Sequence, residues 1–374
     1  MTIPAEFVQQ RQQKLASALS AAGLDALALN PSESLIYLTG LHFHLSERPV
    51  VGIFFPEADP WIVLPELESA KLAGLAYPLQ ATTYGEDPAS WPQRYADALS
   101  GSAALKIGLE DNAMRLLEYR LLKSALPKAK FIDATDVLAG LRMYKDSIEV
   151  AAMQKAAEIA ETALSAAIAQ IKIGMTELEV AGILIQELFK AGSGGELPFQ
   201  PIVSTGPNGA NPHAVPSERP LQHGDLLVID FGASVDGYFS DITRTFALGK
   251  YSPEQAHVYN AVLSANQAGH AAAAPGAACQ DVDRAARKVI EDAGYGEYFI
   301  HRTGHGLGMQ AHEAPYIRSN NPQPLEPGMT FTIEPGIYLP ERFGVRIEDD
   351  VLVTPNGLRS LTTFPRELQV IGDK

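Results

Sequence analysis

The sequence predicts two domains, a smaller N-terminal α/β domain over residues 1–140 and a larger C-terminal α+β domain over residues 141–374. The first reason is length, because 374 residues exceed the roughly 150 residues of an average domain. The second reason is a change of pattern, since strand-like and helix-like stretches alternate only up to about residue 133. Beyond that point, well-capped helices and antiparallel strand-like runs dominate the chain.

The N-terminal region is expected to be a small α/β domain. Apolar runs bounded by turn residues predict strands at residues 25–29, 35–38, 50–55, 61–64 and 107–109. Helix-like stretches lie before and between these runs, at residues 4–22, 67–75 and 114–126. Strands that alternate with helices are typical of this class.

Three helices of the C-terminal region begin with a capping box, in which Ser, Thr or Asp precedes Glu or Gln by three residues. The pairs are Asp146 with Glu149, Thr176 with Glu179, and Ser252 with Gln255. A fourth helix is expected over residues 281–294. Strand-like runs at residues 226–231, 239–246, 330–334 and 345–353 predict a mostly antiparallel sheet that these helices cover.

The composition excludes several classes of protein. Apolar residues make up 46% and charged residues 20% of the chain, as in ordinary globular enzymes. A net charge of −15 argues against nucleic acid or anionic membranes as partners. No apolar run approaches the roughly 20 residues that a membrane span needs, and the start resembles no secretory signal. Cys279 is the only cysteine, so an intrachain disulfide is impossible and a cytoplasmic location is expected.

The segment VIDFGASVDGYFSDITRTF predicts a β-hairpin. Asp236 and Gly237 form a favoured two-residue turn between its two apolar runs. Counting back from this turn places Thr243 opposite Asp230 and puts Asp241 on the same face as Asp230. Such diagonal neighbours lie about 7–8 Å apart at the backbone, so both carboxylates can converge.

Two carboxylates this close repel each other, so they share a proton, bind cations or stay solvated. In an isolated hairpin, ordinary surface residues would be the preferred interpretation. The interpretation as a cation site therefore depends on the other groups that the sequence supplies.

A second candidate hairpin is FTIEPGIYLPERFGVRIEDDVLV. If its tip is centred on Glu341, then Glu334 and Glu348 lie directly across from each other on one face. Arg346 shares that face. The register is an assumption here, because a slip of one residue would turn one glutamate away. Without a slip, the chain has a second pair of carboxylates.

Three histidines lie between the hairpins, in the segment HRTGHGLGMQAHEAP. His305 stands between two glycines, which permit tight backbone geometry and leave its imidazole open to a ligand. Beside four carboxylates, it is the natural nitrogen ligand of an oxygen-rich site. His312, together with His213 in NPHAVPS, is expected to face the substrate or to support the ligands. His301 is interpreted as a structural or surface histidine.

Four carboxylates and one imidazole match a site for two divalent cations about 3.5–4 Å apart. The four negative charges neutralise two such ions. This donor set suits manganese, cobalt, iron or zinc. The sequence contains no GxxxxGK[ST], HExxH or GxSxG motif, so the signatures of phosphate-loop nucleotide hydrolases, zincins and serine hydrolases are missing.

These residues and their order resemble the pita-bread-fold metallopeptidases, which include methionine aminopeptidase, aminopeptidase P and prolidase. The resemblance covers about residues 145–370. The N-terminal region, with NPSESLIYLTG at residues 30–40, is similar to the α/β domain of prolidase, aminopeptidase P and creatinase. That domain favours the proline-directed enzymes over methionine aminopeptidase, and the intact ligands argue against creatinase. The matching motifs are VIDFG with Asp230, SDITRTF with Asp241, GHGLG with His305, IEPGIY with Glu334, and VRIED with Glu348.

The resemblance implies a pita-bread C-terminal domain that binds two divalent ions per subunit, with manganese, cobalt or zinc as the candidates. Asp241 and Glu348 would contact both ions. Asp230 would complete one ion site, and His305 with Glu334 would complete the other. The implied reaction is hydrolysis of the peptide bond before proline in dipeptides or short peptides.

The resemblance also implies roles for the residues around the ions. Glu334 would take and relay the proton of the attacking water. His213 and His312 would stabilise the tetrahedral intermediate or position the proline side of the substrate. Arg346 and Thr243 would support the ligand carboxylates from behind.

One position departs from the resemblance. Some prolidases have an arginine four residues after the histidine matched by His312, where it can bind the carboxylate of the substrate, but this chain has Tyr316. Similar enzymes are commonly homodimers in which one subunit's N-terminal domain reaches the other's active site. Arg48, in the segment LHFHLSERP, is therefore the predicted substitute cation, although a solvated loop is the simpler interpretation of this segment.

Two other functions remain open at this point. One is an aminopeptidase P that acts on longer peptides, and the other is a pita-bread protein that binds without catalysis. The five intact ligands argue against the second. The expected partners are a proline-containing dipeptide or short peptide and a second copy of the chain.

Overall fold

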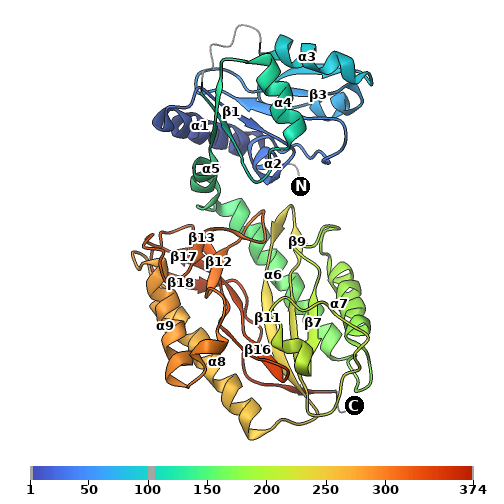
Figure 1. Ribbon diagram of the computed structural model, residues 1–374, viewed down its shortest axis with the longest axis vertical. Coiled ribbons are helices and arrows are strands. Elements are labelled where there is room, and N and C mark those ends of the chain that lie inside the picture. Colours follow the sequence, from blue (N-terminus) through green and yellow to red (C-terminus); the bar gives the residue numbers. More distant parts are fainter. Residues whose placement is uncertain (1–2, 100–105, 373–374) are drawn as a thin grey trace. The chain divides into compact units, whose positions relative to one another are not determined.

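The computed structural model describes residues 3–99 and 106–372. Its internal contacts divide the chain into two units, Met1–Arg142 and Met143–Lys374 (Figure 1). The first unit ends with helix α5 (Thr135–Arg142), and the second begins just before helix α6 (Ser147–Ile168). No helix in the described ranges is long and apolar enough to cross a membrane.

The first unit is an α/β domain, and its described strands form a six-stranded sheet in the order β4-β3-β2-β1-β5-β6. Trp91 and Tyr95 from one helix, with Leu121 and Leu122 from another, pack on one face of this sheet. The strands are β1 (Ala26–Leu29), β2 (Val51–Phe54), β3 (Trp61–Pro65), β4 (Gln80–Tyr84), β5 (Lys106–Leu109) and β6 (Lys130–Asp133). The helices before α5 are α1 (Ala5–Ala22), α2 (Glu33–Thr39), η1 (Glu66–Leu72), η2 (Pro88–Ser90), α3 (Trp91–Ala98) and α4 (Leu116–Ala125).

One sequence-based prediction for this unit is wrong. Residues 35–38 are not a strand but part of helix α2, which Ser32 caps and which ends at Gly40 with a φ of 68°. A short apolar run does not distinguish a buried strand from a buried helix, and here the serine cap and the glycine carried the missing signal. The helix expected at residues 67–75 is present as the 3-10 helix η1, which covers Glu66–Leu72.

The second unit contains two larger sheets within residues 143–372. One has the order β19-β11-β8-β7 and the other the order β13-β12-β14-β17-β18, while β9 pairs with β10 and β15 with β16. The first group of strands is β7 (Ile202–Thr205), β8 (Leu226–Phe231), β9 (Ser234–Val235), β10 (Tyr238–Phe239), β11 (Ile242–Leu248) and β19 (Val370–Ile371). The second group is β12 (Gly304–Gly306), β13 (Glu313–Ile317), β14 (Thr330–Ile333), β15 (Gly336–Leu339), β16 (Phe343–Arg346), β17 (Asp349–Thr354) and β18 (Gly357–Ser360).

Helices lie outside these sheets on both sides, as Figure 1 shows. Helices α6 and α7 bury their apolar faces against β8 and β11, and α8 and α9 pack against β14 to β17. The helices after α6 are α7 (Glu177–Ala191), η3 (Gly206–Ala210), α8 (Pro253–Ala272), α9 (Cys279–Asp292) and η4 (Gly296–Tyr298). Four acidic residues singled out from the sequence each lie within one residue of the end of a strand in these sheets: Asp230, Asp241, Glu334 and Glu348.

The three capping boxes are confirmed at the starts of α6, α7 and α8. In each one, the side chain of the capping residue accepts a hydrogen bond from a backbone N–H of the first turn. A cap of this kind contributes about 1 kcal/mol to helix stability. Local sequence therefore determines where these helices begin.

Candidate metal centre

The first predicted hairpin has the expected register. Val235 pairs with Tyr238, and Thr243 of β11 pairs with Asp230 of β8. Left-handed backbone angles at the turn, with a φ of 53° at Asp236, match the tight turn that Asp-Gly favours. Because the register is unbroken, the side chains of Asp230 and Asp241 lie on the same face of the hairpin.

The second hairpin has its tip at Glu341, as assumed from the sequence, and the φ of this residue is 61°. The β15–β16 ladder pairs Gly336 with Arg346, and the β14–β17 ladder pairs Ile333 with Asp349. Glu334 and Glu348 lie between these two ladders and face each other in the same register. The assumption made from sequence is therefore confirmed.

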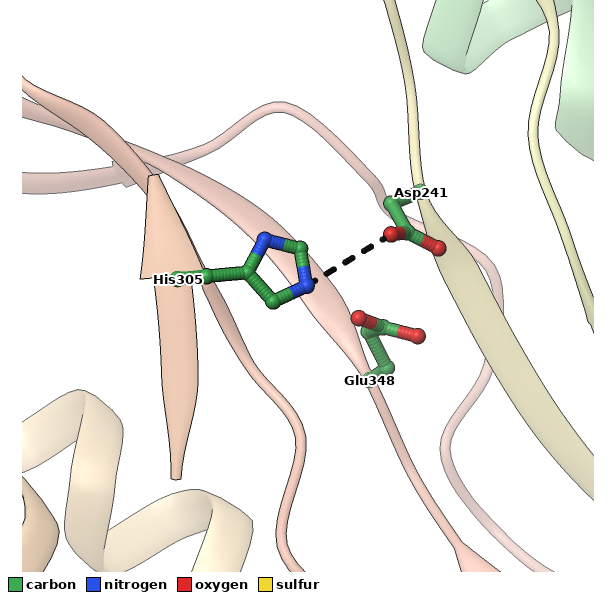
Figure 2. A group of neighbouring side chains, drawn as sticks. All are labelled: Asp241, His305 and Glu348. Atoms are coloured by element: carbon green, nitrogen blue, oxygen red, sulfur yellow. Dashed lines mark ion pairs between the residues drawn. The ribbon is translucent and has the colours of Figure 1, made fainter. Parts of the chain in front are cut away.

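Asp241, His305 and Glu348 form the centre of the site. Figure 2 shows their side chains pointing toward one another, and their potential ligand atoms all lie within 4.8 Å of each other. His305 Nε2 lies 3.8 Å from Asp241 Oδ2 and 3.3 Å from Glu334 Oε1. His305 Nδ1 lies 3.1 Å from the carbonyl oxygen of Gly306, which fixes the proton on Nδ1 and leaves the Nε2 lone pair facing the carboxylates.

The electrostatics of this cluster fit bound cations. Burial, together with the neighbouring carboxylates, raises the pKa of Asp241 and of Glu348. Burial also raises the pKa of Glu334 to about 8, with a contribution from Asp230. Burial and the nearby His312 lower the pKa of His305, so its ring is neutral as a ligand must be. Acids this close ionise together only when positive charge is added.

Unsatisfied oxygens point to the same conclusion. Asp230 Oδ1 and Asp241 Oδ1 are buried and have no hydrogen-bond partner in the described part of the chain. Buried polar atoms almost always have partners, so orphaned carboxylate oxygens in one cluster are typical of metal ligands. The donor set of carboxylates and one imidazole suits divalent transition metals.

Arg346 supports one of the carboxylates from behind. Its guanidinium donates to Asp230 Oδ2, to Thr243 Oγ1 at 3.1 Å and to Tyr338 Oη at 2.7 Å. Thr243 in turn donates to Glu348 Oε2 at 2.6 Å. Arg346 therefore orients Asp230, while Thr243 orients Glu348.

A buried ionic network that the sequence reasoning missed lies behind the cluster. Asp350 Oδ2 accepts a hydrogen bond from the backbone N–H of Asp241 at 2.9 Å. Arg244 donates to the backbone oxygen of Glu348 at 2.6 Å and to Asp349 Oδ1 at 2.8 Å. The acidic run that begins with Glu348 was the available signal, because consecutive buried acids need cations or donors.

The cluster forms one wall of a cavity of about 890 Å³. His213 and His312 also line it, and the His312 ring lies 3.9 Å from that of His305 between centroids. The apolar part of the lining comes from Phe199, Ile202, Pro212, Ala214, Val215 and Ala311. A cavity of this size and mixed lining can hold a short peptide.

His301 lines the same cavity, but its ring nitrogens are engaged. Nδ1 lies 2.7 Å from the backbone oxygen of Arg302, and Nε2 lies 2.9 Å from Tyr338 Oη. Burial and the nearby Arg346 lower the pKa of His301 to about 3, so the ring remains neutral. These contacts agree with the structural role expected from sequence.

Comparison with known proteins decides the family. Residues 151–355 match the profile of metallopeptidase family M24, and residues 11–144 match the creatinase/prolidase N-terminal domain. The chain belongs to metallopeptidase family M24. This M24 protein therefore has the pita-bread C-terminal domain and the smaller α/β N-terminal domain that the sequence predicted, and it is a metallopeptidase that uses divalent metal ions.

Several relatives of the M24 chain cover nearly its full length. The dipeptidase PepE of Mycobacterium ulcerans has a solved structure that is 38% identical, with a TM-score of 0.89 over 99% of this chain and 100% of that one. A prolidase from Thermococcus sibiricus is 35% identical, with a TM-score of 0.91 over 97% and 99% of the two chains. An Xaa-Pro dipeptidase of Lactobacillus delbrueckii subsp. lactis is 34% identical over 96% of this chain and 98% of its own length.

The two substrate residues expected from sequence, Arg48 and Tyr316, are not among the described lining residues of the cavity. Arg48 belongs to the first unit, where its guanidinium binds Glu86 at 2.9 Å and also contacts Glu47. Its action on a partner subunit stays a prediction. Tyr316 pairs with His305 across β12 and β13 and is absent from the described lining of the cavity.

Sequence reasoning missed Arg302 as a site residue of the M24 chain. It lines the cavity, and its Cζ lies 4.7 Å from the centroid of the Tyr316 ring. Its signal in the sequence was weak, because one arginine beside His301 matches no ligand spacing. Only the fold of β12 against β13 places it over the tyrosine ring.

The metal-free M24 protein should become less stable as pH rises. An acid whose pKa is raised in the folded state contributes stability below its unfolded pKa of about 4.3, and that stability is lost as pH rises through the folded pKa. For Glu334 the folded pKa is about 8. One pKa unit is worth about 1.4 kcal/mol, and each kcal/mol moves Tm by roughly 2–4 °C in a domain of this size. Chelator-treated protein should therefore lose several degrees of Tm from pH 5 to pH 8.

Added Mn²⁺ should restore Tm at pH 8, because cations replace the missing protons. The Glu334→Gln variant should show a shallower decline, since its amide does not titrate. A Tm of the chelated wild type that stays flat or rises over this range would contradict the arrangement of charges described above.

Proposed function

We propose that this metallopeptidase hydrolyses the peptide bond before proline in dipeptides, using two divalent ions. The observation that carries the proposal is the convergence of two carboxylate pairs and His305 on the wall of a cavity of about 890 Å³. The substrate class is supported by relatives named Xaa-Pro dipeptidase and prolidase, which align over almost the whole chain. The apolar wall supplies a surface suited to a pyrrolidine ring.

We assign the ligands as two groups. Asp230, Asp241 and Glu348 would hold one ion, and Asp241, Glu348, His305 and Glu334 would hold the other. The 3.3 Å between His305 Nε2 and Glu334 Oε1 supports placing these two residues in the same group. The negative charge of four carboxylates balances two divalent ions. Manganese, cobalt and zinc all suit this set of ligands.

When bound, the ions polarise the scissile carbonyl and lower the pKa of the attacking water. Glu334 accepts the proton of that water and passes it to the leaving nitrogen, a role that suits a carboxylate held in a buried site. His213 and His312 stand on the cavity wall, where an N–H can donate to the oxygen of the tetrahedral intermediate. Arg346 keeps Asp230 in place throughout.

Replacement of either wall histidine should reduce catalysis without loss of metal. His213→Ala and His312→Ala should each lower kcat/KM by roughly 10²-fold, because removal of one donor to an oxyanion has about this effect. Metal content per subunit, measured by elemental analysis, should match that of the wild type. His223→Ala provides a matched control, since His223 is outside the described lining of the cavity. Loss of metal in either variant would instead make that histidine a ligand.

The substrate class is tested by three peptides on metal-reconstituted enzyme: Ala-Pro, Ala-Pro-Ala and Ala-Ala. We expect rapid cleavage of Ala-Pro and little cleavage of the other two. Equal kcat/KM on Ala-Pro-Ala would make the protein an aminopeptidase P, and equal kcat/KM on Ala-Ala would remove the requirement for proline. We also propose a homodimer, which light scattering coupled to size-exclusion chromatography tests directly.

A further inference from the structure

Arg302 is a cation of the cavity wall that lacks a direct ion-pair partner among the residues the structure describes. Its guanidinium has neither a hydrogen bond nor an ion pair within residues 3–99 and 106–372. Arg346, the other arginine of the lining, is different because Asp230, Thr243 and Tyr338 accept its hydrogen bonds. A half-buried guanidinium with its donors unused favours an anionic ligand.

Tyr316 holds this arginine in place. Arg302 Cζ lies 4.7 Å from the centroid of the tyrosine ring, within the range of a cation–π contact. The ring is itself fixed, because Tyr316 belongs to β13 and pairs with His305 of the metal cluster. The guanidinium is therefore held by an element that also positions a metal ligand.

The charged residues that line the cavity leave the positive charge of Arg302 unbalanced. The described lining contains four carboxylates, Asp230, Asp241, Glu334 and Glu348, and two arginines. If two divalent ions neutralise these four carboxylates, the charge that remains on the lining is that of the two arginines. The guanidinium of Arg346 binds Asp230, whereas that of Arg302 lines the cavity together with His213 and His312.

We propose that Arg302, positioned by the ring of Tyr316, binds the α-carboxylate of the dipeptide substrate and so selects dipeptides over longer peptides. The assignment rests on the proposed function, because only a dipeptide presents a free carboxylate one residue after the scissile bond. It replaces Arg48 in this role, since Arg48 already has Glu86 and Glu47 as partners in its own unit. It also gives Tyr316 a role, as the residue that positions Arg302.

The test compares Ala-Pro with Ala-Pro amide, which has the same scissile bond but no terminal charge. Arg302→Met keeps an unbranched stem over the tyrosine ring and removes the charge. It should raise KM for Ala-Pro by roughly 30-fold or more, as expected when one member of a hydrogen-bonded charge pair is truncated. Its kcat for Ala-Pro and its KM for the amide should change little. Arg302→Lys should lie between Arg302→Met and the wild type.

Tyr316 gives a second measurement. Tyr316→Phe keeps the ring face and should leave the preference for Ala-Pro over the amide intact. Tyr316→Leu removes the ring and should raise KM for Ala-Pro alone, with unchanged metal content. Arg318→Met, which alters an exposed arginine just beyond β13, is the matched control and should behave as wild type.

The outcomes separate this assignment from the proposed function. The wild type on Ala-Pro tests the function, and the ratio between dipeptide and amide in each variant tests Arg302. If the wild type prefers Ala-Ala, the same ratio is measured with Ala-Ala and its amide. Equal effects of Arg302→Met on both substrates, or no effect, would overturn the assignment. A selective effect on the dipeptide from Arg48→Ala, without one from Arg302→Met, would also overturn it.

Discussion

Asp241→Ala should abolish turnover and lower the bound metal. Asp241 offers one oxygen to the cluster with His305 and Glu348, and its second oxygen is buried without a hydrogen-bond partner in the described ranges. Removal of this carboxylate leaves the ions closer to mutual repulsion than to charge balance. Loss of several kcal/mol of metal-assisted stabilisation corresponds to at least roughly 10³-fold in kcat.

Two further variants test whether the loss of metal is due to the missing negative charge at position 241. Asp241→Asn keeps the shape and size of the side chain and should also lose metal, because an amide lacks the negative charge. Asp281→Ala removes an exposed carboxylate of α9, whose side chain is 57% exposed, and should leave both metal content and turnover unchanged. Full metal occupancy with near-normal turnover in Asp241→Ala would refute the ligand assignment.

Glu334→Gln should lower kcat far more than it weakens substrate binding. The carboxylate lies 3.3 Å from His305 Nε2, and its pKa of about 8 shows how strongly the site disfavours uncompensated charge there. A glutamine of nearly the same shape cannot take a proton from water. General acid–base catalysis contributes about 10²–10⁴-fold, and we expect a loss of kcat in that range.

The measurement is kcat and KM for Ala-Pro at saturating metal concentration, so that weaker metal binding does not imitate lost proton transfer. Glu341→Gln, at the exposed tip of the same hairpin, is the matched control and should not differ from the wild type. An unchanged kcat in Glu334→Gln would place the proton relay on another group.

The two hairpins could be predicted because strand geometry is local. Asp-Gly fixes the first turn, and the two-residue alternation of a strand then determines which side chains share a face. The same counting from Glu341 places Glu334 opposite Glu348, as observed across the two ladders. The helices with capping boxes were predictable for the same reason, since their signals lie within four residues.

Other features depended on contacts between segments that are distant in the sequence. The apolar run at residues 35–38 predicted a strand, because the run alone does not reveal that Ser32 caps a helix there. The hydrogen bond from the backbone N–H of Asp241 to Asp350 joins positions 109 residues apart, and no local sequence pattern predicts it. Arg302 is recognised as a site residue only in the folded chain, where β13 places the Tyr316 ring against its guanidinium.

The sequence by itself determined which ligand groups this protein can offer to cations, because Asp230, Asp241, Glu334 and Glu348 supply four carboxylates and His305 supplies one imidazole. The tertiary structure alone decided that Arg302 also lines the cavity. The sequence already placed Arg346 beside the carboxylates, where its guanidinium donates to Asp230, Thr243 and Tyr338, whereas nothing in the sequence marked Arg302, whose guanidinium lies over the Tyr316 ring. The physical reason is that ligand type is a property of side chains, whereas the availability of a charge depends on every group that packs around it.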